Sequence, residues 1–121
     1  MLFKPLICLG EENTLLIATS ADFPPMESLD SSNEFVGFDI DLMRAVAKEA
    51  GFSVEFKNVS WYTIFAGLDS GKYDAVISCV TITQERSKQY DFSIPYLQGD
   101  QVLVAQKEEK AIDSLNNLNQ K

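Results

Sequence analysis

Two hydrophobic periodicities alternate along this chain. Short apolar runs at residues 15–19, 54–59 and 73–80 have the β-branched composition or the every-second-residue pattern of strands. Between them, residues 42–50 place apolar side chains on one helical face, and residues 64–68 repeat this pattern over a shorter stretch. Strands that alternate with helices predict the α/β class, as a three-layer α/β/α sandwich with a largely parallel sheet and right-handed crossovers.

The first predicted helix has recognisable ends. Asp39 and Asp41 suit its first turn, because carboxylates interact favourably with the positive end of the helix dipole, and Gly51 suits its last position. The Pro-Pro pair after the first strand excludes a helix there. The polar residues 30–34 predict a turn.

The segment of residues 74–96 carries the clearest candidate chemistry. Its buried strand leads into a loop with Thr81 and Thr83, and then into a predicted short helix at residues 84–90 that carries Arg86. A carboxylate ligand needs a planar cation for its two oxygens and hydroxyl or backbone N–H donors near a helix start. The segment therefore predicts a carboxylate-binding site at the carboxyl edge of the sheet. The same residues also fit an ordinary strand-turn-helix, in which Thr83 caps the helix and Arg86 pairs with a nearby acid.

Composition narrows the class of protein. A chain of 121 residues with 45% apolar content can form one domain with a core, but hardly two. A net charge of -8 argues against binding to nucleic acids or anionic membrane surfaces, which calls for clustered Lys and Arg. No apolar run approaches the roughly 20 residues of a membrane-spanning helix.

The cysteines and the first residues give weaker signals. Residues 1–13 are expected to be a leader or a cloning remnant. Cys8 is a candidate for lipid attachment, but the residues before it lack the small side chain that usually precedes a lipid-attachment cysteine. Cys79 is expected to be a core or cleft-edge residue. Neither cysteine has a spacing that suggests metal, so no metal ligand and no cofactor are expected, and nothing favours a disulfide between the two cysteines.

Several motifs occur in an order that points to a known family. They are FPPMES at residues 23–28, VGFDIDLMRAVAKEAG at 36–51, AGLDSGKYDA at 66–75, TIT-x-E-R at 81–86 and DFS-x-PY at 91–96. In the order of these motifs, the chain resembles the polar amino-acid-binding proteins of bacterial ABC importers. These are members of solute-binding protein family 3 and have the periplasmic-binding-protein type II fold. The likeness covers roughly residues 14–121.

The resemblance implies that residues 14–121 form the first lobe of a two-lobed binding protein. It places a hinge-crossing strand near residues 101–106, and the sequence predicts a short helix at residues 111–118. In the family, a second lobe supplies the main acidic partner of the ligand's ammonium group. A first lobe alone is therefore expected to bind weakly.

The resemblance also implies roles for polar residues of the candidate site. Arg86 matches the bidentate clamp on the ligand carboxylate, and Thr81 matches a hydroxyl donor to that carboxylate. Ser78 and Cys79 match positions whose backbone or side-chain groups contact the ligand's ammonium or carboxylate.

Phe23 and Trp61 match aromatic positions that flank the ligand side chain, although aromatics that follow strands are also common at a hydrophobic rim or in a core. Ser20 is expected to contact the ligand, but it occupies a position that often carries an acid in members that bind basic or amide side chains. This difference argues against a strongly cationic ligand, unless Asp22 or Glu27 substitutes for the missing acid.

The predicted function is therefore non-catalytic binding of a polar L-amino acid for ABC-type import. The expected location is periplasmic or extracellular, with a lipid anchor if Cys8 is modified. The expected partners are the amino acid and, through the full-length protein, ABC permease subunits. One alternative is a module that forms homodimers or exchanges strands through an exposed hinge strand. A third hypothesis is a dehydratase-like enzyme that uses Asp22 and Glu27 as acids, although the chain has no histidine.

Overall fold

The computed structural model describes residues 14–100, 102 and 104. The chain divides after Thr81 into two compact units.

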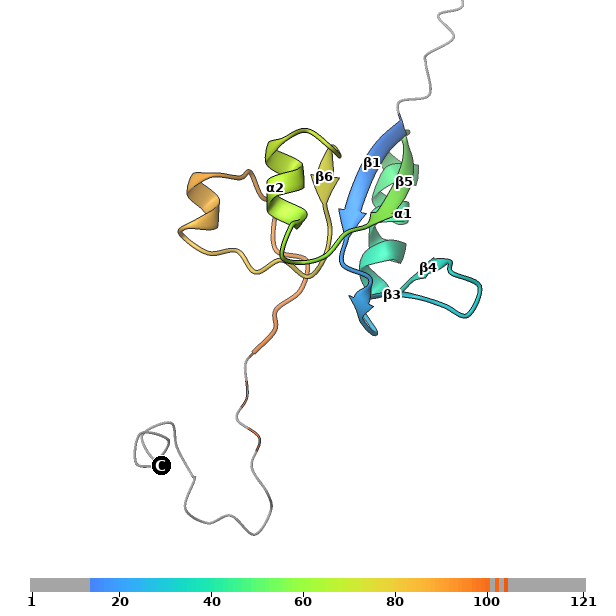
Figure 1. Ribbon diagram of the computed structural model, residues 1–121, viewed down its shortest axis with the longest axis horizontal. Coiled ribbons are helices and arrows are strands. Elements are labelled where there is room, and N and C mark those ends of the chain that lie inside the picture. The colour runs from blue at the N-terminus through green and yellow to red at the C-terminus, as the bar shows by residue number, and fades with distance from the viewer. Residues whose placement is uncertain (1–13, 101, 103, 105–121) are drawn as a thin grey trace, which may run out of the picture. The chain divides into compact units, whose positions relative to one another are not determined.

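The core of the first unit is a parallel sheet of three strands, shown in Figure 1. Strand β1 (Thr14–Thr19) lies between β5 (Ser53–Asn58) and β6 (Ala75–Val76), and it pairs in parallel with both. Ile17, Ala18 and Thr19 of β1 are fully buried, as expected for the central strand of a parallel sheet. This arrangement confirms the predicted α/β class with a parallel sheet.

Strand β6 is shorter than the predicted strand at residues 73–80, but its alignment with β1 continues at both ends. The backbone N–H of Asp74 donates to Leu16 O (2.8 Å), and that of Ile77 donates to Ala18 O (3.0 Å). The Asp74 carboxylate also accepts the N–H of Leu16 (2.8 Å). A side chain thus takes over one hydrogen bond of the ladder before β6. At the other end, the Ile77 bond to Ala18 O keeps the chain after β6 alongside the end of β1.

Helix α1 (Phe38–Ala50) has the ends that the sequence predicts at Asp39 and Gly51. Its first turn donates N–H groups to backbone carbonyls of the segment with the Pro-Pro pair, from Phe38 to Pro25 O (3.1 Å) and from Asp39 to Met26 O (2.9 Å). At its other end, Gly51 adopts the left-handed conformation (φ 78°) and donates to Ala47 O (2.9 Å).

Helix α2 (Ile64–Asp69) contributes Ile64 to a core cluster that also contains Ala18 and Tyr73. The Tyr73 hydroxyl donates a hydrogen bond to Ile64 O, and burial raises the pKa of this phenol. Gly67 lies directly against the Tyr73 ring, where a Cβ atom would overlap with the phenol. A residue without a side chain is therefore what allows α2 to approach this tyrosine.

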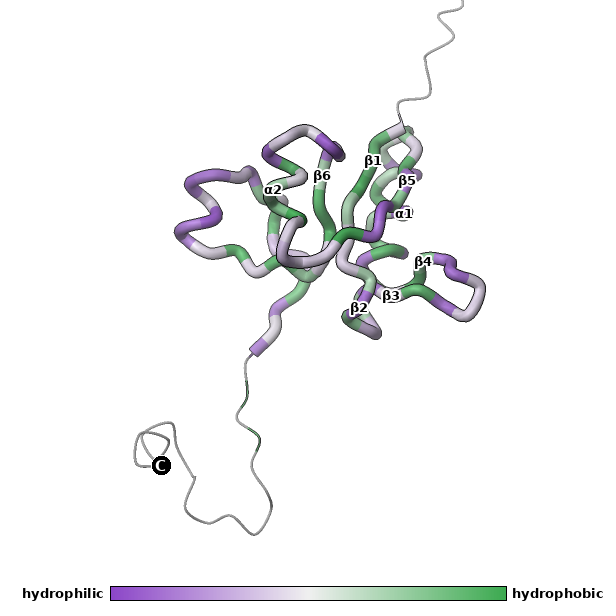
Figure 2. The backbone as a smooth tube through the Cα atoms, in the orientation of Figure 1, coloured by the Kyte–Doolittle hydropathy of each residue, from purple (hydrophilic) through white to green (hydrophobic). Residues whose placement is uncertain are grey.

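A second, antiparallel sheet lies where the sequence predicts only a loop and a turn. It consists of β2 (Asp22–Phe23), β3 (Glu27–Leu29) and β4 (Phe35–Val36), in the order β2-β3-β4. Oδ1 of Asp30 accepts N–H groups from Ser32 (2.7 Å) and Glu34 (3.0 Å), which stabilises the reversal between β3 and β4. In Figure 2 this turn is hydrophilic, whereas β1 and β6 are hydrophobic.

The second unit contains a 3-10 helix, Arg86–Lys88, in place of the longer helix predicted at residues 84–90. Thr83 Oγ1 accepts the N–H of Arg86 (3.2 Å), but the N-cap residue of this shorter turn is Glu85, whose side chain makes no capping hydrogen bond. The predicted helix at residues 111–118 and most of the predicted hinge strand near residues 101–106 lie outside the described residues. Among the helices that are described, none is both long enough and apolar enough to span a membrane.

Candidate functional site

The residues that follow β1 and β6 meet at the carboxyl edge of the parallel sheet. Ser20 follows β1, and Ser78 and Cys79 follow β6. The backbone N–H of Ser20 donates to Ser78 Oγ (3.0 Å), and the Ser20 hydroxyl donates to Asp22 Oδ1 (3.1 Å). Three of the residues predicted for the site are thus brought together, at the edge where open α/β sheets bind ligands.

Glu27 lies beneath this edge rather than at its surface. It is only 1% exposed, and its Oε1 accepts the Ser78 hydroxyl at 2.6 Å, while no group of the described chain donates a hydrogen bond to its Oε2. Burial raises the pKa of Glu27 to about 7, against the opposing effect of the Ser78 hydrogen bond, and the nearby charge of Asp39 raises it further. The expectation that Glu27 could act as an acid facing the ligand does not fit this inward position.

Asp39 joins the first turn of α1 to the loop after β6. Its carboxylate is fully buried, and Oδ2 accepts the backbone N–H of Cys79 at 2.7 Å. The Cys79 thiol lies 3.9 Å from Oδ1 of the same carboxylate. Cys79 adopts a left-handed conformation (φ 46°), which is uncommon for a residue other than glycine, and the hydrogen bond to Asp39 holds the backbone there.

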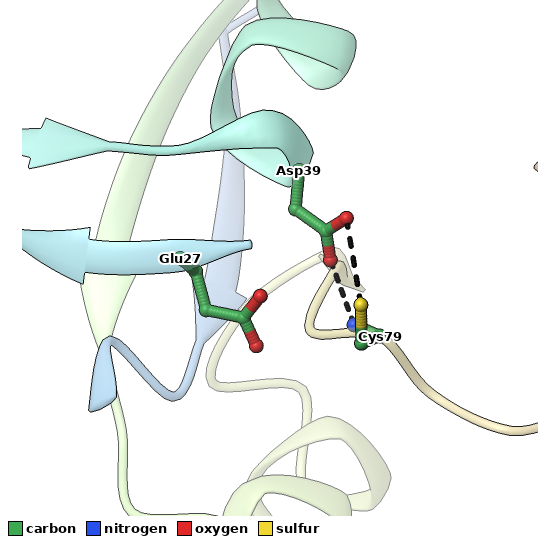
Figure 3. A group of neighbouring side chains, drawn as sticks. All are labelled: Glu27, Asp39 and Cys79. Atoms are coloured by element: carbon green, nitrogen blue, oxygen red, sulfur yellow. Dashed lines mark hydrogen bonds between the residues drawn. The ribbon is translucent and has the colours of Figure 1, made fainter. Parts of the chain in front are cut away.

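Figure 3 shows Glu27, Asp39 and Cys79 as a cluster that extends from β3, the start of α1 and the loop after β6. One ligand-capable atom from each lies within 4.8 Å of the other two. Sequence reasoning assigned Asp39 only to the helix dipole and missed this contact, because it depends on tertiary packing. The sequence signal that could have indicated this cluster is that Glu27, Asp39 and Cys79 lie in or beside the motifs quoted above.

The two aromatic residues predicted to contact the ligand differ in their surroundings. Phe23 is 58% exposed on β2. Trp61 is half-buried and packs against the core cluster of Ala18, Ile64 and Tyr73. Its ring meets that of Phe65 edge-on, with ring centroids 5.6 Å apart and an interplanar angle of 76°. Trp61 therefore has a packing role, and the ligand contact of both aromatics stays a prediction.

The predicted carboxylate clamp falls on both units. Thr81 is exposed at the end of the first unit, and Arg86 is half-buried on the 3-10 helix of the second. The clamp therefore stays a prediction.

Known proteins resemble this chain over most of its length. The probable histidine-binding protein of Neisseria gonorrhoeae is 45% identical over 98 residues, which are 81% of this chain and 37% of that protein. The ABC transporter arginine-binding protein 1 of Escherichia coli K12 is 45% identical over 89 residues, 74% of this chain and 37% of the relative. The chain thus spans well under half the length of these relatives.

Solved structures agree with the fold. An arginine-bound variant of domain 1 from TmArgBP matches with a TM-score of 0.66 and 40% identity, over 70% of this chain and 66% of that one. An ancestral cyclohexadienyl dehydratase matches with a TM-score of 0.65 and 39% identity, over 70% of this chain and 35% of that one.

The model of one family matches residues 15–120, which is nearly the whole chain. This match confirms the resemblance that the motifs indicate. The chain belongs to the bacterial extracellular solute-binding proteins, family 3.

Proposed function

We propose that this chain forms the first ligand-binding lobe of an amino-acid-binding protein and binds a polar L-amino acid without chemical conversion. The carboxylate of the amino acid is bound by the planar guanidinium of Arg86 and by the Thr81 hydroxyl. The whole protein presents the amino acid to an ABC importer in the periplasm or outside the cell.

The meeting of Ser20, Ser78 and Cys79 at the carboxyl ends of β1 and β6 is the observation that carries this proposal. Ser20 N–H and Ser78 Oγ are already linked at 3.0 Å, so this edge is polar and held in one arrangement before any ligand arrives. Pre-organised polar groups lower the entropic cost of binding. The arginine-bound domain 1 from TmArgBP supports the idea that one lobe of this kind can hold an amino acid.

The ligand class follows from the polar edge and from the relatives. Their names describe binding proteins for histidine and arginine. Asp22, which accepts the Ser20 hydroxyl at 3.1 Å, supplies a carboxylate beside the position where Ser20 replaces the acid common in such proteins. We therefore propose an amino acid with a basic or amide side chain.

The dehydratase relative raises the question of catalysis. Glu27, an acid considered for such chemistry, is 1% exposed and accepts the hydroxyl of Ser78. A general acid must reach the proton acceptor on the substrate, and this carboxyl group is directed into the protein. This position supports binding over catalysis.

An NMR titration of the labelled chain with L-arginine, L-histidine and L-glutamine tests the proposal, with D-arginine as a stereochemical control. We expect saturable amide shifts at Ser20, at residues 78–81 and at Arg86. Arg86→Lys should weaken binding strongly, because a point charge cannot reproduce the planar fork of hydrogen bonds. Lys88→Arg, a matched exchange on the same 3-10 helix, should leave affinity unchanged.

Two results would contradict the proposal. A well-dispersed spectrum that does not change with any of these amino acids would exclude binding by this lobe. Equal affinity of the parent chain and Arg86→Lys would exclude the clamp.

A further inference from the structure

The cluster of Glu27, Asp39 and Cys79 has an unmet electrostatic requirement. Two carboxyl groups, both at most 1% exposed, face one another across a distance at which two negative charges repel strongly. Oε2 of Glu27 has no hydrogen-bond donor among the described residues, although a buried carboxylate oxygen without a partner is costly. The cluster therefore needs a positive charge, supplied by a shared proton or by a cation.

The chemistry of the three side chains distinguishes among cations. Ca²⁺ and Mg²⁺ prefer sites made of oxygen ligands alone, whereas a cysteine sulfur favours borderline or soft metal ions such as Zn²⁺. One sulfur and two carboxylates form a set of three protein ligands, which leaves one position of a tetrahedron for water.

We propose that Glu27, Asp39 and Cys79 form a binding site for a zinc-class divalent cation. The cation would bind Oε2 of Glu27, a carboxylate oxygen of Asp39 and Sγ of Cys79. The cysteine spacing in the sequence predicts no such site, because the ligands come from three separate elements.

The geometry lies close to what tetrahedral zinc needs. With Zn–S near 2.3 Å and Zn–O near 2.1 Å, neighbouring ligand atoms would be about 3.4–3.6 Å apart. Sγ of Cys79 is already 3.9 Å from Oδ1 of Asp39, and no pair of ligand atoms exceeds 4.8 Å. Contraction of the ligand-atom separations by at most about 1.4 Å would complete the site.

The surroundings favour binding at this point. The backbone N–H of Cys79 holds Oδ2 of Asp39, and the Ser78 hydroxyl holds Oε1 of Glu27. Each carboxylate is thus held by a hydrogen bond to one oxygen while its other oxygen faces the cluster, as hydrogen-bond donors around a metal site orient its ligands. Cys79 is only half-buried, which provides an entry path. On binding, its thiol and any protonated carboxyl group release protons to solvent, because the thiolate and carboxylate are the ligands.

Titration of the full chain with Co²⁺ and Zn²⁺ tests this site, in a Cys8→Ser background that removes the other thiol. We expect one metal ion per chain by calorimetry, and with Co²⁺ a thiolate-to-metal charge-transfer band. Ca²⁺ should not compete. Cys79→Ser should abolish the band, and Cys79→Ser and Glu27→Gln should each weaken Zn²⁺ binding by about tenfold or more.

Asp41→Asn is the matched control, because Asp41 also lies in the first turn of α1 but is exposed. It should bind Zn²⁺ like the parent. Glu27→Gln keeps an acceptor for the Ser78 hydroxyl, so this variant is expected to fold even if the Cys79 variant does not, and circular dichroism verifies both. A Co²⁺ spectrum without a thiolate band, or Zn²⁺ affinity unchanged in folded Glu27→Gln, would overturn the proposal.

Discussion

The hydroxyl of Ser78 donates a 2.6 Å hydrogen bond to Oε1 of Glu27, a residue 51 positions earlier in the chain. The same hydroxyl oxygen accepts the backbone N–H of Ser20 at 3.0 Å. One buried oxygen atom therefore links the chain after β1, strand β3 and the chain after β6. The edge of the sheet proposed to bind the ligand depends on this link for its arrangement.

Substitution of Ser78 by alanine should destabilise the chain by about 1–3 kcal/mol. The change leaves a buried backbone N–H and a buried carboxyl oxygen without a hydrogen-bond partner. Each group has then lost its hydrogen bonds to water without gaining one in the protein. Urea unfolding measures the difference. Ser31→Ala, in the exposed turn between β3 and β4, should stay within about 0.5 kcal/mol of the parent. Equal unfolding midpoints for the two variants would contradict the structural role of Ser78.

Glu27 should make the stability of the metal-free chain depend on pH. Its pKa is raised from 4.5 to about 7 in the folded state, so the folded state binds this proton more tightly than the unfolded state. The stabilising contribution is fully present below pH 4.5 and is lost as the pH rises to about 7. A shift of this size corresponds to about 3 kcal/mol.

The contribution of Glu27 is isolated by comparing the parent with Glu27→Gln in the presence of a chelator. The free energy of unfolding of the parent, relative to this variant, should fall across that pH range and then level off. Glu34→Gln removes an exposed carboxylate from the turn after β3 and controls for the loss of one negative charge. Parallel pH profiles for the parent and Glu27→Gln would show that Glu27 titrates normally.

Local pattern was sufficient to predict the main elements. Helix α1 begins and ends where Asp39 and Gly51 indicate, because an acidic first turn and a left-handed terminal glycine are local features. Strands β1 and β5 follow from apolar content and alternation. The β2-β3-β4 sheet was not predicted, because its strands are very short and depend on a turn held by Asp30.

The candidate site was predictable only in part. The positions of Ser20, Ser78 and Cys79 follow from strand order, since residues after neighbouring parallel strands meet at one edge. The burial of Glu27 and its approach to Asp39 depend on the packing of β3 against α1, which no periodicity encodes. Acidic residues in sequence are normally assigned to the surface, and that prior failed for both of these carboxylates.

Gly67→Ala should destabilise the first unit by about 1–3 kcal/mol. The new Cβ atom would overlap with the phenol of Tyr73, so the ring must move and weaken its hydrogen bond to Ile64 O. Gly99→Ala is the matched control, because a Cβ atom there meets nothing within 4 Å. Thermal unfolding compares the two variants, and a Gly67→Ala chain as stable as the parent would show that α2 can shift without cost.

Trp61 should serve both packing and ligand binding, and Trp61→Phe separates the two roles. Phenylalanine keeps an aromatic ring against Phe65, so the cost in unfolding free energy should stay below about 1.5 kcal/mol. The smaller ring offers a weaker face to a cationic side chain, and loss of about 0.5–2 kcal/mol would lower affinity for L-arginine roughly 2- to 30-fold.

Phe65→Leu is the control for this experiment, because it disturbs the same aromatic pair from within α2. It should reduce stability and leave amino-acid affinity close to that of the parent. NMR titration of both variants measures the affinities under conditions where each is folded. If Trp61→Phe and Phe65→Leu reduced affinity equally, Trp61 would act on the ligand only through packing, and its predicted contact with the amino acid would be wrong.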